Sequence, residues 1–253
     1  MGNFAGKGIT MARAKQKQIN FLDTEVKRLR TKALEVYRRL LQTHGERPLK
    51  PRREPMHELI STMLSHRTTQ QNEATAFEQM WQHFGSWEAI RDAPVAELAE
   101  TIAPSNFAEA KAPNIKKTLQ RIIEERGEAS IDFLAGLPVE EGLAWLMSLP
   151  GVGIKTASLV LLFCFAKPIL PVDTHVHRVS QRVGLIGPKV TPEAAHGLLL
   201  TLLPADPYVL FNFHVSLLKH GQKICIWGTP RCQQCPLTDL CDWYQNNRAV
   251  SEK

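Results

Sequence analysis

The sequence predicts an all-α protein. Apolar residues recur at helical spacing along most of the 253 residues, as Leu59, Ile60, Met63 and Leu64 illustrate. Convincing alternating strand patterns are absent, and proline and glycine separate the periodic segments. About ten helices with short links are typical of a helical fold, and the 43% hydrophobic content suits a packed core.

The N-terminal part of the chain is basic. Residues 1–21 are rich in Gly, Ala and Lys, have no acid, and predict a disordered tail. A charged helix is expected over Phe21–Thr43, followed by a breaker-rich linker over His44–Pro55. Residues 1–55 hold fourteen Lys and Arg against five Asp and Glu. This excess favours a polyanionic partner, nucleic acid first, although charge alone fits a solvated tail equally well.

The remaining chain is expected to be helical between its breakers. Helices are predicted near residues 59–64, 70–84, 94–102, 109–126, 139–147, 154–165, 174–184, 192–203 and 207–220. The longest apolar run, Ala157–Ala166, is too short to span a bilayer, and no signal-peptide pattern follows the N-terminus. We therefore expect no membrane partner and take the bacterial cytoplasm as the default location.

The five cysteines fall into two groups. Cys164 stands alone in an apolar helix and is expected to be a small buried hydrophobe. Cys225, Cys232, Cys235 and Cys241 follow one another at spacings of six, two and five residues. Without a secretory signal, such a cluster indicates a metal site rather than disulfides. The spacing leaves open both a single zinc ion and an iron–sulfur cluster.

The segment "LMSLPGVGIKTASLV" indicates a helix, a tight turn and a second helix. Gly151 and Gly153 allow positive φ and the close approach of another backbone. Free N–H groups in the turn and at the next helix start suit a phosphate oxygen. A Walker A loop is excluded because it needs glycine directly before the lysine, where this chain has Ile154. The segment therefore predicts a phosphate-binding hairpin.

Lys155 stands where a helix least favours a cation. The helix dipole disfavours its charge by about 0.3–1 kcal/mol. One explanation is that the side chain extends to solvent or pairs with a phosphate. The other is that the pKa of the amine is lowered, so that the neutral amine is a nucleophile able to form a Schiff base. Asp173 is expected to start the next helix, where it could also be an N-cap. The connection between the two helices is long enough to bring Asp173 back to Lys155.

These features together resemble the endonuclease III family of helix–hairpin–helix DNA glycosylases. The resemblance rests on "LPGVGIKTA", on "VDTH" at the matching distance, on "HG" at His220–Gly221 and on the cysteine spacing. It covers about residues 25–245 and implies two helical lobes with a DNA groove between them. The implied ranges are 57–167 for a six-helix barrel lobe, 22–56 with 168–245 for an iron–sulfur cluster lobe, and 246–253 for a tail. It also implies a [4Fe–4S] cluster on the four clustered cysteines.

The resemblance implies base excision chemistry. A damaged base is turned out of the duplex, Lys155 attacks C1′, and Asp173 supports the cationic sugar or the proton transfers. The Schiff base then permits β-elimination. The implied protein is a monomeric glycosylase and AP lyase for oxidised pyrimidines in double-stranded DNA of the nucleoid. A monofunctional uracil or thymine-mismatch glycosylase, and a non-catalytic DNA-binding protein, are the alternatives that the presence of both Lys155 and Asp173 disfavours.

The same resemblance implies DNA-contacting residues. Gly151, Val152 and Gly153 would hold the DNA backbone. Arg67 stands where the family commonly has a glutamine that fills the gap left by the turned-out base, and Phe107 aligns with its wedge residue. Arg67 could read a base or bind a phosphate, and Phe107 could equally be a core residue. No chemistry is expected of His66 or His175.

Overall fold

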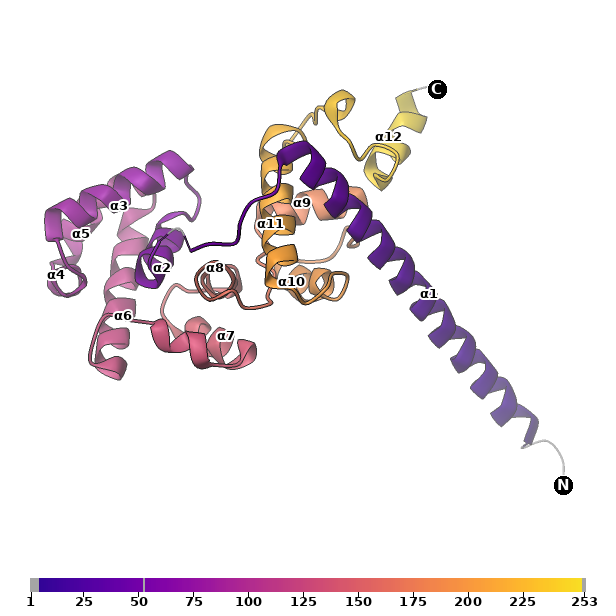
Figure 1. Cartoon of the computed structure of the whole chain (residues 1–253), viewed down its shortest axis with the longest axis horizontal. Coiled ribbons are helices and arrows are strands. Elements are labelled where there is room, and N and C mark those ends of the chain that lie inside the picture. The colour runs from indigo at the N-terminus through magenta and orange to yellow at the C-terminus, as the bar shows by residue number, and fades with distance from the viewer. Residues whose placement is uncertain (1–4, 52, 252–253) are drawn as a thin grey trace. The chain divides into compact units, whose positions relative to one another are not determined.

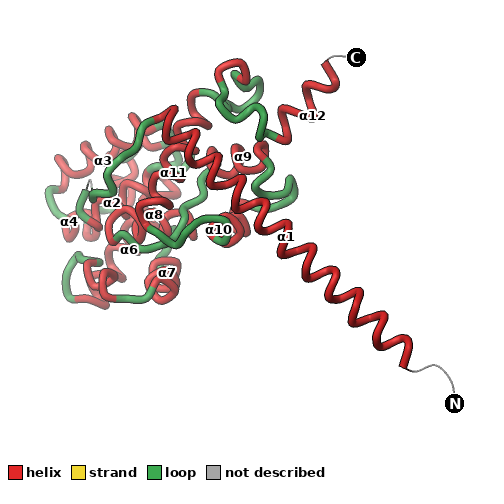
Figure 2. Tube along the Cα trace, turned by 45° about the vertical axis from the view of Figure 1, so that its right-hand side comes forward, coloured by secondary structure: helices red, strands yellow, loops and turns green. Residues whose placement is uncertain are grey.

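The computed structural model describes the backbone of residues 5–51 and 53–251, and side-chain surroundings for residues 23–51 and 53–247. Figure 2 shows these residues as helices joined by loops, without a strand in the described ranges. The all-α prediction is therefore confirmed. No helix of the described residues has the length and apolar character needed to cross a bilayer.

The chain forms two compact units. Unit one comprises residues 1–46, 174–204 and 215–253, and unit two comprises residues 47–173 and 205–214. The lobe boundaries that the resemblance implies, at 56/57 and 167/168, stay a prediction, while the linker after residue 46 lies in unit two. The reason is local bonding: the backbone of Arg47 exchanges hydrogen bonds of 2.9 and 3.0 Å with the side chain of Asn212, and Arg53 pairs with Glu73 at 3.1 Å.

Unit two contains most of the helices (Figure 1). They are α2 (Pro55–Leu64), α3 (Gln70–Phe84), α4 (Trp87–Asp92), α5 (Val95–Thr101), η1 (Ala103–Ser105), α6 (Ala108–Arg126), η2 (Asp132–Gly136), α7 (Val139–Ser148) and α8 (Ile154–Phe165). Helix α8 packs against α2 and α7 through its apolar side chains. Sequence periodicity missed α4, which is too short to show it. Ser86 caps this helix by accepting from the amide of Ala89, and Trp87 and Ile90 anchor it in the core.

Unit one contains the two ends of the chain. Its elements are α1 (Ala5–His44), α9 (Thr174–Val183), α10 (Pro192–Leu200), the second half of α11 (Pro207–Lys223), η3 (Cys232–Gln234) and α12 (Asp242–Ser251). The first half of α11 belongs to unit two.

Both ends of the described chain are helical. The expected disordered tail over residues 1–21 is helical from Ala5, because Ala, Met, Lys, Gln and Arg all favour helix; residues 1–4 lie outside the described chain. The expected tail over residues 246–253 is helical to Ser251 within α12, and residues 252–253 lie outside the described chain.

Candidate active site and cysteine pocket

The turn between α7 and α8 depends on Gly151. Its φ is +75°, and a Cβ at this position would lie 2.9 Å from the Cβ of Asn114. Glycine is therefore required both by the backbone and by the neighbouring side chain. Gly153 differs from the sequence prediction, because its φ of −98° is open to any residue and a Cβ would meet nothing within 4 Å. Its missing side chain leaves the backbone uncovered.

Side chains of α6 hold this hairpin in place. The hydroxyl of Thr118 donates to the Pro150 carbonyl at 2.8 Å, and Arg121 donates to the Ser148 carbonyl at 2.6 Å. Val152 is buried, whereas Gly151 and Gly153 are exposed.

The backbone amides of the hairpin are available to a ligand. Among the described residues, no carbonyl accepts from the amides of Gly151 or Gly153, and Gly153 caps α8 without a side-chain bond. The positive end of α8 adds to these donors. Unpaired amides at a helix N-terminus are the kind of donors that suit an anion such as a phosphate.

Lys155 is the second residue of α8 and is half-buried. Burial lowers the pKa of its amine, and the carboxylate of Asp173 acts against that shift. Asp173 directly precedes α9 and is also half-buried. The fold thus brings the two residues together in unit two, and the amine has an increased neutral fraction beside a carboxylate.

His214 is a neighbour of this pair that sequence reasoning missed. Its ring is buried, its Nδ1 donates to the Pro171 carbonyl at 2.9 Å, and it lies edge-on to Phe163 with centroids 5.7 Å apart. Burial lowers its pKa and Asp173 opposes that effect, which places the imidazole near the carboxylate. A histidine inside an apolar helix gives no sequence signal of such a position.

His66 is a second histidine near Lys155. Its Nε2 is 3.2 Å from the hydroxyl of Thr156, which is itself buried. Burial, with the charges of Lys155 and Lys111, lowers the pKa of His66 to about 4. A neutral imidazole therefore flanks the lysine at neutral pH. His175 belongs to unit one instead, where its Nδ1 accepts from Arg178 at 3.1 Å.

Arg67 and Phe107 come from separate loops and lie together. The guanidinium carbon of Arg67 is 5.7 Å from the centroid of the Phe107 ring. Phe107 is 58% exposed, so the alternative that it is a core residue is wrong. Both residues have positive φ, at +54° and +52°. An exposed aromatic ring and a cation are thus presented on one surface of unit two.

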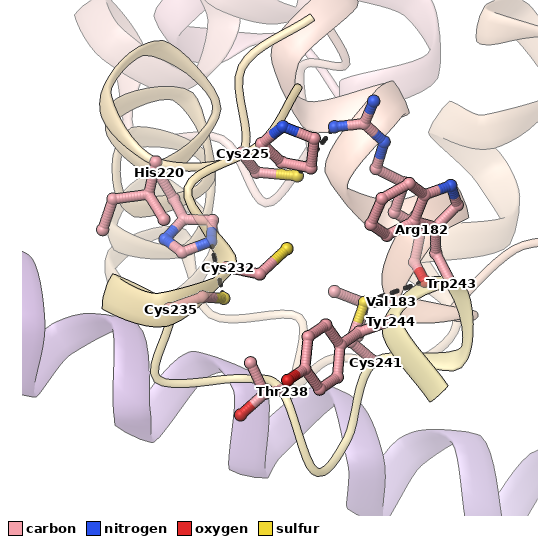
Figure 3. A pocket seen from close by; sticks show the side chains of 12 residues that line it. Arg182, Val183, His220, Cys225, Cys232, Cys235, Thr238, Cys241, Trp243 and Tyr244 are labelled. Atoms are coloured by element: carbon pink, nitrogen blue, oxygen red, sulfur yellow. Dashed lines mark hydrogen bonds between the residues drawn. The ribbon is translucent and has the colours of Figure 1, made fainter. Parts of the chain in front are cut away.

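The clustered cysteines line one cavity of unit one. Figure 3 shows the sulfur atoms of Cys225, Cys232, Cys235 and Cys241 around a common space. Among the described residues, no three potential metal ligands stand close enough to hold one ion. A single zinc ion needs its sulfur ligands about 2.3 Å from one point. Four thiols around one space are a ligand set that an iron–sulfur cluster uses.

Two cationic or polar side chains contact the cysteine sulfurs. Arg182 donates to the sulfur of Cys225 at 3.4 Å, and Nε2 of His220 lies 3.5 Å from the sulfur of Cys235 (Figure 3). The buried Arg178 donates to the Cys225 carbonyl at 3.1 and 3.0 Å.

Burial disfavours the ionised thiolate form of these cysteines. It raises the pKa of the Cys235 thiol to about 11 and also raises those of Cys232 and Cys241. A bound metal group would offset this cost, because its positive charge stabilises thiolates. Hydrogen-bond donors to sulfur are the surroundings that such a group needs.

Comparisons with known proteins show what this chain is similar to. Residues 60–205 match the family described as HhH-GPD superfamily base excision DNA repair protein. Endonuclease III of Thermotoga maritima is 33% identical over 213 residues, which are 84% of this chain and 92% of that protein. A solved non-covalent endonuclease III–DNA complex has a TM-score of 0.74 at 24% identity, over 87% of this chain and 98% of its own. A thermostable thymine-DNA glycosylase has a TM-score of 0.68 at 22% identity, over 89% and 99%. The two structures share the fold of this chain.

Proposed function

The chain belongs to the HhH-GPD superfamily as an endonuclease III homologue and is a base excision repair DNA glycosylase, and we propose that it also cleaves the DNA strand as an AP lyase. The observation that carries the lyase proposal is the half-buried amine of Lys155 beside Asp173 at the N-terminus of α8. A purely hydrolytic glycosylase has no need of a nucleophilic lysine, because water attacks the sugar.

The proposed reaction begins with Lys155 as the nucleophile. Its neutral amine forms a bond to C1′ of the sugar while the bond from C1′ to the base breaks, and the base leaves with that electron pair and takes up a proton. The carboxylate of Asp173 stabilises the positive charge that develops on the sugar or accepts the proton from the attacking amine.

Strand cleavage follows from the covalent intermediate. Opening of the sugar ring breaks the bond from C1′ to the ring oxygen and gives a protonated Schiff base on Lys155. Loss of a proton from C2′ then expels the 3′ phosphate by β-elimination, and water releases the enzyme from the sugar. The lowered pKa of Lys155 supports the first step, since only the neutral amine can attack.

The proposed partner is double-stranded DNA that contains a damaged base or an abasic site. Support comes from the free amides at Gly151 and Gly153, which suit a phosphate, and from the surface formed by Arg67 and Phe107. The basic residues of α1 would add nonspecific attraction to the phosphates. We propose that the protein acts as a monomer, and that its base substrates are oxidised pyrimidines, as the family resemblance implies.

The proposed cofactor is a [4Fe–4S] cluster held by Cys225, Cys232, Cys235 and Cys241. Support comes from the four sulfurs around one cavity and from the donors Arg182 and His220 beside them. When bound, the cluster would link distant points of the C-terminal loop, which has few apolar residues of its own.

One set of substrates tests this proposal against its alternatives. Duplexes carrying thymine glycol, uracil or a thymine–guanine mismatch are incubated with the protein and analysed with and without hot alkali. The proposal predicts strand breaks at thymine glycol without alkali. Breaks that need alkali would indicate a monofunctional glycosylase, and binding without base release would indicate a non-catalytic protein.

A further inference from the structure

Lys111 is a buried lysine that the chemistry proposed above does not use. It is the fourth residue of α6 and only 9% exposed. Its amine donates to the carbonyls of Leu64 and Ser105, each at 2.6 Å. Leu64 ends α2 and Ser105 ends η1, where carbonyls lack partners within their own helix. One side chain therefore joins the ends of two elements that are far apart in sequence.

The two elements lead directly into two strained loops. We call residues 65–68 and 105–107 the paired loops. They contain three of the four non-glycine residues with positive φ in the described chain: Arg67 at +54°, Asn106 at +60° and Phe107 at +52°. Such conformations cost about 1–2 kcal/mol each for residues with a Cβ. They persist only where the surrounding structure holds them.

A second connection joins the paired loops to each other. The side-chain amide of Asn106 donates to the Arg67 carbonyl and to the Thr68 hydroxyl, each at 3.3 Å. Phe107 is the N-cap residue of α6 and makes no side-chain capping bond, and its exposed ring lies near the Arg67 guanidinium. The bonds of Lys111 and Asn106 therefore fix the surface that Arg67 and Phe107 present.

The energetics of Lys111 indicate a purpose for its burial. Removal from water lowers the pKa of its amine to about 8, so burial of the charged form is unfavourable. An apolar side chain would fill the same volume without this cost. The two charge-assisted bonds to carbonyls offset part of this cost, and they also connect the ends of α2 and η1, which no apolar side chain could do.

We propose that Lys111 is a positioning residue that keeps the paired loops pre-organised to enter the base stack while a base is turned out. The inference rests on the proposed function. Turning out a base requires unstacking, which costs a few kcal/mol. Loops that are already ordered lose little further entropy when they fill the gap. Lys111 therefore acts on base opening, through Arg67 and Phe107, and not on the bond-breaking steps at Lys155.

The test compares two substrates in Lys111→Met and in the control Lys116→Met. Lys116 lies on the same helix and also donates to a carbonyl, that of Ala93, away from the paired loops. One duplex carries a paired damaged base, and the other carries a pre-formed abasic site with no base opposite it. In Lys111→Met, excision of the paired base should fall at least about tenfold, while borohydride trapping at the abasic site falls less than about threefold. Lys116→Met should leave both rates near wild type.

Two further measurements make the result decisive. Hydrogen exchange of residues 65–68 and 105–107 should quicken in Lys111→Met and not in Lys116→Met. If Lys111→Met does not fold, Asn106→Gly takes its place, because glycine accepts the φ of +60° and removes only the second connection. It should give the same selective loss of excision.

The outcomes separate the two proposals. If Lys111→Met lost equal activity on the two substrates, or left hydrogen exchange of the paired loops unchanged, the role of Lys111 would be overturned. In either case, excision and trapping by the wild-type protein would still support the proposed function. A wild-type protein that neither excises nor traps would overturn the proposed function, and the role of Lys111 in base opening with it.

Discussion

Nε2 of His66 lies 3.2 Å from the hydroxyl of Thr156, the residue that follows Lys155 in α8. The contact joins the end of α2 to the start of α8, next to the proposed nucleophile. Because burial keeps this imidazole neutral, it adds no charge beside Lys155 at physiological pH. The environment of the lysine is therefore set by burial and by Asp173.

Stability should fall as the pH decreases from about 6.5 to about 4. Burial lowers the pKa values of His57 and His66 to about 4 from the ordinary 6.5. In this range the unfolded chain binds protons that the folded chain does not, so each histidine favours unfolding as the pH decreases. Urea unfolding at a series of pH values should show a shallower decline in the double variant His57→Gln/His66→Gln. Equal slopes in variant and wild type would contradict the assignment.

Replacement of Asp173 should have two opposite effects: it should lower the pKa of Lys155 and yet slow the excision of a damaged base. The carboxylate raises the pKa of the amine, so Asp173→Asn should lower that pKa further. The pH dependence of trapping at a pre-formed abasic site should shift to lower pH. Excision of a damaged base should nevertheless slow by about 100-fold or more, because the developing sugar cation loses its counter-charge. A shift to higher pH, or unchanged excision, would exclude this role.

Two glycine variants should differ although they lie two residues apart. Gly151→Ala places a Cβ 2.9 Å from Asn114 and puts alanine at a positive φ that it rarely adopts. The variant should therefore lose at least about 1–2 kcal/mol of unfolding free energy and bind DNA more weakly. Gly153→Ala should leave stability nearly unchanged, since its Cβ meets nothing within 4 Å. Chemical unfolding and binding to an abasic-site analogue measure both effects. Equal destabilisation by the two variants would mean that the hairpin geometry is wrong.

The cysteine pocket should hold iron and sulfide. Purified protein should be brown and contain about four of each per chain, as a [4Fe–4S] group requires. Cys235→Ser should lose iron, whereas the control Cys164→Ser should keep it, because Cys164 lies outside the pocket and burial raises its pKa to about 12. A colourless protein with one zinc per chain would refute the proposed cofactor.

The sequence was most informative where one local pattern determined the structure. Helical periodicity located α8 at its observed bounds, and the connection after it is long enough for Asp173 to return to Lys155. The spacing of the four cysteines likewise predicted one shared site, and their sulfurs face one cavity.

Features that depend on long-range contacts were not predictable. Nothing local indicates that Arg67 and Phe107 take positive φ, because distant bonds from Lys111 and Asn106 hold them there. His214 resembles any buried helix histidine until the fold places it near Asp173.

The most direct test of the central claim is borohydride reduction of the protein with an abasic-site duplex, followed by peptide mapping of the adduct. The account predicts one covalent link, on Lys155, that Lys155→Gln abolishes and Lys117→Gln retains; Lys117 is an exposed lysine of α6. The absence of any adduct, or an adduct on another lysine that persists in Lys155→Gln, would contradict the account.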